Sequence, residues 1–223
     1  MIVAIDGPAA SGKSTVARAV ARSLGFRYLD TGAMYRAIAV EALYQGVSLE
    51  DDDGLIAVAR NSSIEFEHTP GDPIHTGVLV NGRDVTREIR TPEADLAVSP
   101  VSRIPEVREA MVKLQRELAS VSDTVVEGRD IGTVVFPDAP VKVYLTATAE
   151  ERARRRLGDH VAAGHSSEIA AVAADIERRD RVDSTRAVSP LRPADDAITV
   201  DTTGMTVDEV VARITTISRA VLH

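Results

Sequence analysis

Residues 7–15 read Gly-Pro-Ala-Ala-Ser-Gly-Lys-Ser-Thr. Two glycines bracket four residues, and a lysine and a serine follow, which is the spacing of a phosphate-binding loop. The apolar run at 2–5 predicts a buried strand before the loop, and Val16, Val20 and Leu24 predict a helix after it. A strand, a glycine-rich loop and a helix in this order predict a site for nucleotide phosphates.

Each part of this loop can contribute to the binding of a triphosphate. Its backbone N–H groups point inward, and the helix N-terminus adds a partial positive charge. Lys13 can reach the β- and γ-phosphates, the hydroxyl of Ser14 can ligate Mg²⁺, and Thr15 can contact the α-phosphate. A glycine-rich turn that caps a helix by chance is the plainer alternative. We predict that ATP is bound by Gly7, Pro8, Ala9, Ala10, Ser11, Gly12, Lys13, Ser14 and Thr15.

Strand and helix patterns alternate along most of the chain. Buried strands are expected at 2–6, 27–29, 124–127, 141–146 and 197–201. Helices are expected at 14–24, 31–44, 105–120, 149–157, 167–181 and 207–221. This alternation predicts an α/β fold with a parallel sheet that helices cover on both faces. Ligands of such sheets bind beyond the carboxyl ends of the strands.

Residues 62–90 have a different pattern. The segment 64–67 alternates apolar and charged residues, and the apolar run 78–80 is followed by Asn81-Gly82. Asn-Gly is a strong signal for a hairpin turn. We therefore predict a small antiparallel sheet inserted into the α/β fold.

The composition excludes several classes of protein. The 223 residues carry a net charge of −8, which argues against a general nucleic-acid binder. The chain has no cysteine, so it can form no disulfide or thiolate metal site. No apolar run approaches the ~18 residues of a membrane span, and no leader precedes the first strand pattern. We expect a cytoplasmic protein that binds neither nucleic acid nor membrane.

Three kinds of protein fit the loop: a phosphoryl-transfer kinase, a switch or motor NTPase, and a regulatory ATP-binding module. A switch GTPase would read guanine with Asn-Lys-x-Asp, and no lysine outside the loop follows an asparagine. A motor ATPase would have an apolar strand ending in Asp-Glu, whereas residues 125–130 read Val-Val-Glu-Gly-Arg-Asp. A kinase needs a second site that positions the acceptor and excludes water.

Three further segments are specific enough to indicate that second site. Residues 29–36 read Leu-Asp-Thr-Gly-Ala-Met-Tyr-Arg, and residues 127–137 read Glu-Gly-Arg-Asp-Ile-Gly-Thr-Val-Val-Phe-Pro. Arg179-Asp180, Asp183 and Arg186 follow on a late helix. Together with the loop, these segments resemble the bacterial cytidylate kinases, a family of nucleoside monophosphate kinases. The resemblance covers essentially the whole chain, including Glu-Ile-Arg-Thr at 88–91 and Pro-Glu-Val-Arg at 105–108.

The resemblance implies an architecture and an activity. The fold would be a P-loop kinase with a central five-stranded parallel sheet, formed by 1–36 and 101–223, with a short lid at about 154–170. A CMP-binding insertion at 37–100 would hold the small antiparallel sheet. The enzyme would use ATP with Mg²⁺ to phosphorylate CMP and dCMP in pyrimidine nucleotide metabolism, and we expect a monomer.

The resemblance also implies roles for single residues. Lys13, Arg129 and Arg186 would be catalytic, and Ser14 would ligate the metal. The acceptor phosphate would be held by Arg36, Arg129 and Arg186. The cytosine would be recognised by Thr31, Ser99, Arg108 and Asp130. The sugar hydroxyls would meet Arg179 and Asp183, and ATP would also meet Arg152 and Arg156.

Without the resemblance, plainer interpretations of these residues stay open. Arg36 and Arg108 fit solvated helix surfaces, and Asp183 with Arg186 fits a surface ion pair. Asp130 could pair with Arg129 or cap a turn, and the arginines at 152–156 are typical of a solvated face. Asp30 could be a helix cap, or could hold Lys13 or Mg²⁺-bound water. The five histidines lack metal-ligand spacing and are interpreted as surface residues.

The identity of the acceptor also has alternatives. A kinase of the same fold could take UMP, dTMP or a non-nucleotide acceptor, and a regulatory ATP-binding protein would have none. Cytosine carries an exocyclic amine where uracil has a carbonyl, so a carboxylate such as Asp130 would favour cytosine. A mismatched buried polar pair costs ~1–3 kcal/mol, which is roughly tenfold to a hundredfold in discrimination.

Overall fold

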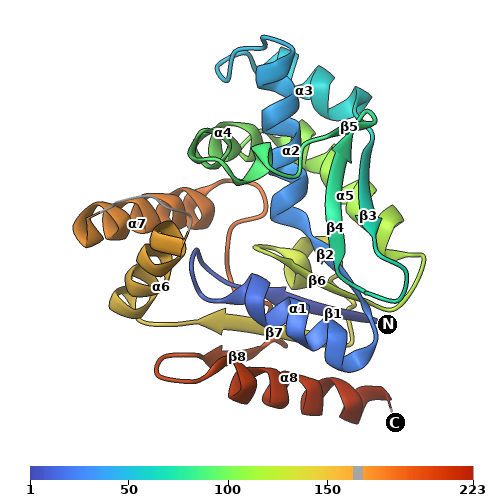
Figure 1. Ribbon diagram of the computed structural model, residues 1–223, viewed down its shortest axis with the longest axis vertical. Helices are drawn as coiled ribbons and strands as arrows, with labels where there is room; N and C mark the ends of the chain where they lie inside the picture. Colours follow the sequence, from blue (N-terminus) through green and yellow to red (C-terminus); the bar gives the residue numbers. More distant parts are fainter. Residues whose placement is uncertain (163–167, 223) are drawn as a thin grey trace.

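A parallel sheet of five strands forms the centre of the chain in the computed structural model, which describes residues 1–162 and 168–222 (Figure 1). The strand order is β2-β6-β1-β7-β8. Their bounds are β1 Ile2–Asp6, β2 Arg27–Asp30, β6 Thr124–Gly128, β7 Val141–Thr146 and β8 Ile198–Asp201. The α/β fold with its five-stranded parallel sheet is thus confirmed.

Helices cover both faces of this sheet. The bounds are α1 Lys13–Leu24, α2 Thr31–Tyr44, α3 Asp52–Asn61, α4 Pro92–Ser102, α5 Pro105–Ala119, α6 Ala149–Ala162, α7 Ile169–Thr185 and α8 Val207–Leu222. In β1, Val3 and Ile5 pack against α1 and α8, whereas Ala4 faces the core beside α2 and α5. All three side chains are fully buried, which explains why the strand is apolar at these successive positions on both faces.

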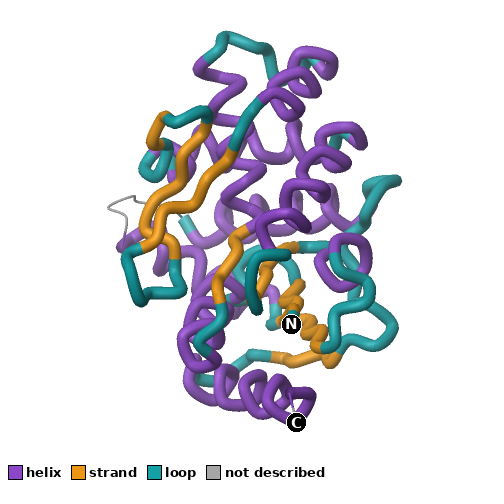
Figure 2. Tube along the Cα trace, turned by 90° about the vertical axis from the view of Figure 1, so that its right-hand side faces the viewer, coloured by secondary structure: helices purple, strands orange, loops and turns teal. Residues whose placement is uncertain are grey.

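The predicted hairpin is present. β3 Ile64–His68, β4 His75–Val80 and β5 Arg83–Asp84 form an antiparallel sheet, and Figure 2 shows it beside the helices. Asn81 and Gly82 connect β4 to β5 with positive φ values of 52° and 77°. Asparagine and glycine tolerate this left-handed conformation, so their side chains explain where the chain reverses.

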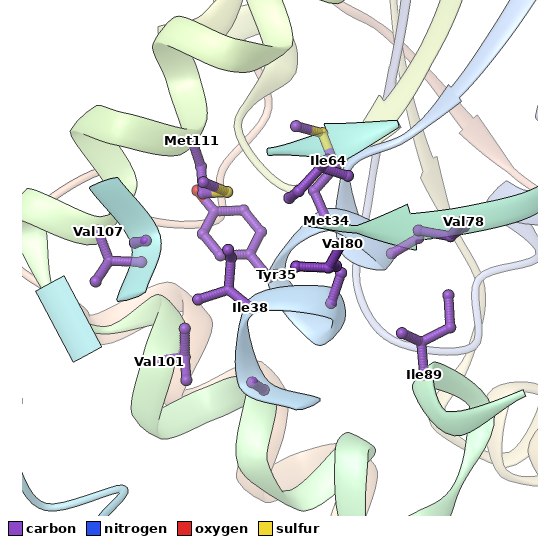
Figure 3. Packing of buried hydrophobic residues seen from close by; sticks show 14 of the residues in the cluster. Met34, Tyr35, Ile38, Ile64, Val78, Val80, Ile89, Val101, Val107 and Met111 are labelled. Atoms are coloured by element: carbon purple, nitrogen blue, oxygen red, sulfur yellow. The ribbon is translucent and has the colours of Figure 1, made fainter. Parts of the chain in front are cut away.

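Helix α2 links the two sheets through a shared core. Met34, Tyr35 and Ile38 lie among Val80 of the hairpin and Met111 of α5 (Figure 3). The buried residues of α2 occur almost all round the helix, because α4, α5 and the hairpin surround it. This packing fixes the hairpin and α4 on one side of the carboxyl ends of β1, β2 and β6.

One interpretation of the histidines is wrong. His75 is buried, and its ring stacks on Tyr28 of β2 with 5.2 Å between the ring centroids. Phe66 packs on the same imidazole at 4.6 Å. The hairpin therefore docks on the edge strand of the main sheet through aromatic contacts that no spacing in the sequence indicates.

The helices near the predicted lid extend beyond their expected ends. Residues 154–162 lie in α6, residues 169 and 170 begin α7, and 163–167 lie outside the described residues. The division into 1–36, 37–100 and 101–223 stays a prediction. None of the described helices combines the length and the apolar character that crossing a bilayer requires.

Candidate active site

A pocket opens at the carboxyl ends of β1, β2 and β6, where the sequence predicts ligand binding. Segments far apart in the chain meet there: the phosphate-binding loop, the start of α2, helix α4, the end of β6 and helices α6 and α7. Its predicted site residues are Ala9, Ala10, Lys13, Ser14, Thr31, Arg36, Ser99, Arg108, Arg129, Asp130, Arg156, Arg179, Asp183 and Arg186. The pocket therefore collects residues from positions 9 to 186.

The phosphate-binding loop connects β1 to α1 through a backbone that only particular residues permit. Gly7 has a φ of 153°, and a Cβ there would lie 2.1 Å from the carbonyl oxygen of Leu145. Gly12, at a φ of 89°, is the N-cap of α1. The two glycines are required because one approaches a neighbouring strand closely and the other starts the helix in the left-handed region.

Lys13 is buried inside this loop. Its Nζ donates to the carbonyl oxygen of Pro8 at 2.7 Å and to the hydroxyl of Ser11 at 3.4 Å. Burial, with a smaller contribution from the charge of the nearby Arg129, lowers the pKa of Lys13 to about 7, and Glu127 opposes the shift. An anion placed beside this ammonium would stabilise its charged form.

The outer side of the loop is held by helices α6 and α7. The backbone N–H of Ala9 donates to Asp180 at 2.9 Å, and Asp180 also pairs with Arg152. Arg155 donates to the carbonyl oxygen of Ser11 at 3.3 Å and to the hydroxyl of Thr202 at 2.9 Å. These contacts fix the loop against the late helices and β8.

Two of these loop-holding residues were not among the predicted site residues. Asp180 lies in the Arg179-Asp180 segment and Arg155 in the arginine run at 152–156. Both segments were noted in the sequence, but neither residue was assigned a role. Arg152 was predicted to meet ATP. The structure instead places it against Asp180 and, at 3.3 Å, the carbonyl oxygen of Ala9.

A hydroxyl and a carboxylate lie together where β6 ends beside the loop. The Ser14 hydroxyl donates to the Glu127 carboxylate at 3.0 Å, and Tyr28 donates to the other oxygen of that carboxylate. Burial raises the pKa of Glu127, the charge of Asp30 raises it further, and Lys13 lowers it. Both oxygen types are ligands that Mg²⁺ accepts together with nucleotide phosphates, so this pair fits the metal. Sequence reasoning had not assigned Glu127 to the metal.

The start of α2 is organised by Asp30. Its carboxylate accepts from the backbone N–H of Ala33 at 2.8 Å and pairs with Arg36 at 3.2 Å. The helix-cap interpretation is thus confirmed, and the same carboxylate orients Arg36 toward the pocket. Thr31 donates from its hydroxyl to the carbonyl oxygen of Glu127 at 2.7 Å, which ties α2 to the end of β6.

Buried ion pairs dominate the opposite side of the pocket. Arg108 and Asp130 pair with each other, and they are only 3% and 5% exposed. Arg186 lies 3.7 Å from both Asp130 and Asp183, and Arg129 donates to Asp183 at 2.9 Å. The solvated interpretation of Arg108 and the surface interpretation of Asp183 with Arg186 are therefore wrong.

Two guanidinium nitrogens in this cluster lack a hydrogen-bond partner among the described residues. They are Nε of Arg108 and Nη2 of Arg186, and both are buried. Buried polar groups are ordinarily paired, so unpartnered donors lining a pocket favour the binding of acceptor-rich ligands. Phosphate and a pyrimidine base both have such acceptors.

The segment after Asp130 is held from β1. Both oxygens of Asp6 accept backbone hydrogen bonds, from Ile131 and Gly132, at 2.8 Å each. Burial raises the pKa of Asp6 to about 6, and these two hydrogen bonds oppose the shift. Asp6 thus places the turn that presents Arg129 and Asp130 to the pocket.

Helix α4 supplies the remaining wall. Ser99 and Asp95 line the pocket four residues apart, on one face of the helix. Asp95 pairs with Arg156 of α6 and lies 3.8 Å from Arg179 of α7. Nothing in the sequence had distinguished Asp95 from other exposed helical acids.

Comparison with known proteins agrees with this geometry. A sequence model of the family described as Cytidylate kinase matches residues 3–220. The cytidylate kinase of Rhodococcus opacus (strain B4) is 52% identical over 216 residues, covering 96% of this chain and 93% of the relative. That of Carboxydothermus hydrogenoformans is 50% identical over 214 residues, covering 96% and 95%. That of Corynebacterium glutamicum is 53% identical over 211 residues, covering 94% and 90%.

Solved structures share the fold at much lower identity. An uncharacterized protein from Eubacterium ventriosum ATCC 27560 has a TM-score of 0.55 at 10% identity, covering 99% of both chains. A gluconokinase from Sinorhizobium meliloti 1021 has a TM-score of 0.50 at 16% identity, covering 98% of this chain and 92% of its own. At these identities the likeness concerns the architecture alone.

Proposed function

The chain belongs to the cytidylate kinase family and phosphorylates CMP and dCMP with ATP; we propose that the two halves of its pocket divide the two nucleotides between them. The phosphate-binding loop and Lys13 hold the β- and γ-phosphates of ATP. The arginines at 36, 129 and 186 hold the acceptor phosphate. This division is supported by the two sets of groups that line the pocket: the phosphate-binding loop with Lys13, and the buried Arg108–Asp130 pair with its neighbouring arginines.

The reaction is a direct transfer between two phosphates. An oxygen of the CMP phosphate forms a bond to the γ-phosphorus, the bond to the β–γ bridging oxygen breaks, and CDP and ADP leave. No general base is needed because the acceptor is already an anion. Lys13, Arg129 and Arg186, which line the pocket, stabilise the charge that spreads over the transferring group.

The metal site proposed for this reaction consists of Ser14 and Glu127, whose side-chain oxygens lie 3.0 Å apart. Mg²⁺ bound there supplies charge neutralisation at the β- and γ-phosphates. Tyr28 holds Glu127 in place through its hydroxyl. Among the described residues, no group of three or more His, Cys, Asp or Glu side chains could hold a metal ion.

Recognition of cytosine is assigned to the buried Arg108–Asp130 pair. Asp130 accepts from the exocyclic amine, and Arg108 donates to the carbonyl or ring nitrogen of the base. Thr31 and Ser99 add hydroxyl contacts, while Arg179 and Asp183 serve the sugar hydroxyls. Uracil would place a carbonyl oxygen against the Asp130 carboxylate. Both groups are hydrogen-bond acceptors, so neither would be satisfied in this buried site.

The observation that carries this proposal is the pair of buried, unpartnered arginine nitrogens beside Asp130. The experiment is a coupled ADP-release assay with Mg·ATP and CMP, dCMP, UMP, dTMP, AMP, GMP or no acceptor. Fast turnover with CMP and dCMP and weak turnover with UMP is expected. Preference for another base would overturn the assignment of Asp130 and Arg108, and acceptor-independent ADP release would overturn the divided pocket.

Beyond the site, we propose a cytoplasmic, monomeric enzyme of pyrimidine nucleotide metabolism. Residues 37–100 are proposed as the CMP-binding insertion and 154–170 as the lid. The closing of both parts over the substrates would exclude water from the transferring phosphoryl group.

A further inference from the structure

Asp95 connects three helices that line the pocket. It lies on α4, and its carboxylate pairs with Arg156 of α6 and lies 3.8 Å from Arg179 of α7 (Figure 1 shows the three helices). Its side chain is 26% exposed, and those of Arg156 and Arg179 are 30% and 14% exposed. One carboxylate thus holds guanidinium groups from two helices at the rim of the nucleotide pocket.

The charges around this contact are unbalanced. Burial lowers the pKa of Arg179, Asp95 opposes the shift, and Arg129 and Arg156 lower the pKa further. Among the described residues, Asp95 is the one carboxylate within 4 Å of Arg179. The carboxylate therefore offsets mutual repulsion among the three arginines, a task that nucleotide phosphate would perform equally well.

We propose that Asp95 competes with the two bound nucleotides for Arg156 and Arg179, and so makes ATP binding depend on the acceptor. The inference rests on the proposed tasks of these arginines, with Arg156 serving ATP and Arg179 serving the acceptor sugar. ATP can engage Nη2 of Arg156, the nitrogen that meets Asp95, only by displacing that carboxylate. An acceptor that engages Arg179 removes part of the hold on Asp95 and lowers the cost of that displacement.

The arrangement of α4 strengthens this coupling. Asp95 and Ser99 lie one helical turn apart on the same pocket-lining face, so one helix carries both a proposed cytosine contact and the competing carboxylate. Binding of the acceptor and binding of the donor are therefore coupled through α4. Asp95 is a positioning residue in this scheme, because it acts through two arginines and touches no reacting atom.

The test measures the dissociation constant of Mg·AMPPNP, a non-hydrolysable ATP analogue, with and without saturating CMP. Asp95→Asn removes the competing charge, so binding without CMP should become about two- to fivefold tighter. The gain in affinity that CMP provides should shrink, by at most the same factor, because CMP removes only part of the competition. A merely structural role for Asp95 would weaken binding instead, and weaker or unchanged binding would overturn the proposal.

Three further variants separate the possible causes. Asp95→Glu keeps the carboxylate and should retain most of the coupling. Asp52 forms an exposed ion pair with Arg103, which is the C-cap of α4. Asp52→Asn removes the same charge as Asp95→Asn and should leave the binding of Mg·AMPPNP unchanged. Tightening of similar size in Asp52→Asn would assign the effect to net charge and overturn the proposal.

Arg156→Gln distinguishes this inference from the proposed function. The variant should bind Mg·AMPPNP more weakly. In the double variant, Asp95→Asn should no longer tighten the binding, because the arginine for which Asp95 competes is gone. If Arg156→Gln binds normally, the proposed task of Arg156 fails, and the inference fails with it. If Arg156→Gln binds weakly while Asp95→Asn alone does not tighten binding, the inference alone fails.

Discussion

In the phosphate-binding loop, the groups offered to an anion are backbone N–H groups and one buried lysine, whereas around Asp130 they are guanidinium groups already paired with carboxylates. The loop achieves its geometry locally, through the left-handed backbone at Gly12 and the close approach of Gly7 to β7. The acceptor side achieves its geometry through ion pairs between α5, α7 and the segment after β6.

This difference follows from what each side must recognise. Triphosphate looks alike in every nucleotide, so a backbone cradle and a point charge suffice. A base must be distinguished from close analogues, and paired side chains provide directional donors and acceptors for that purpose. Substitutions on the two sides should therefore change different kinetic quantities.

The largest effect is expected on the loop side. Lys13→Ala removes the buried ammonium that stabilises the transferring group, and kcat should fall about 10²–10³-fold for every acceptor alike. The fold should persist, because burial already disfavours the charge of Lys13. Lys113→Ala, at an exposed position, is the matched control. Steady-state kinetics with CMP and UMP would contradict this division if the CMP-to-UMP ratio also collapsed.

A smaller and more selective effect is expected on the acceptor side. Asp130→Asn keeps the volume and a carbonyl partner for Arg108, but offers an amide that can donate to uracil. The ratio of kcat/KM for CMP over UMP should fall about tenfold to a hundredfold, while KM for ATP stays unchanged. Asp138→Asn, at an exposed position in the same segment, is the control. A wild-type ratio in Asp130→Asn would mean that another group reads the base.

The two sides also differ in how far the sequence predicts them. The loop is contiguous, so its nine residues and their task follow from spacing and from the flanking strand and helix. The sheet and hairpin follow equally well from apolar runs and from Asn81-Gly82. Arg108 and Asp130 were selected through a family resemblance, because alternation and spacing alone fit a solvated arginine as well.

The residues that sequence reasoning missed have long-range partners. Asp95 is one of two acids on α4, and its importance lies in Arg156, 61 residues away. Arg155 holds Ser11 and Thr202 from two other elements, and His75 is buried because a hairpin docks on Tyr28. Such contacts depend on how elements meet in space, and no local pattern encodes that.

The smallest effect expected is the uptake of at most one proton when Mg·AMPPNP binds. With a pKa of about 7, Lys13 is mostly neutral at pH 8, and a triphosphate beside it should restore its charge. Mg·AMPPNP binding at pH 8 should therefore take up close to one proton, and its affinity should fall as pH rises above about 7. CMP is proposed to meet arginines, which remain charged at this pH.

Calorimetric titration in buffers of different ionisation enthalpy measures this uptake for each nucleotide. Lys13→Met should abolish it for Mg·AMPPNP, and Lys113→Ala should leave it intact. Equal proton uptake for Mg·AMPPNP and CMP, or uptake that survives in Lys13→Met, would show that a group other than Lys13 titrates. The contrast between a switchable lysine on the donor side and permanently charged arginines on the acceptor side would then be wrong.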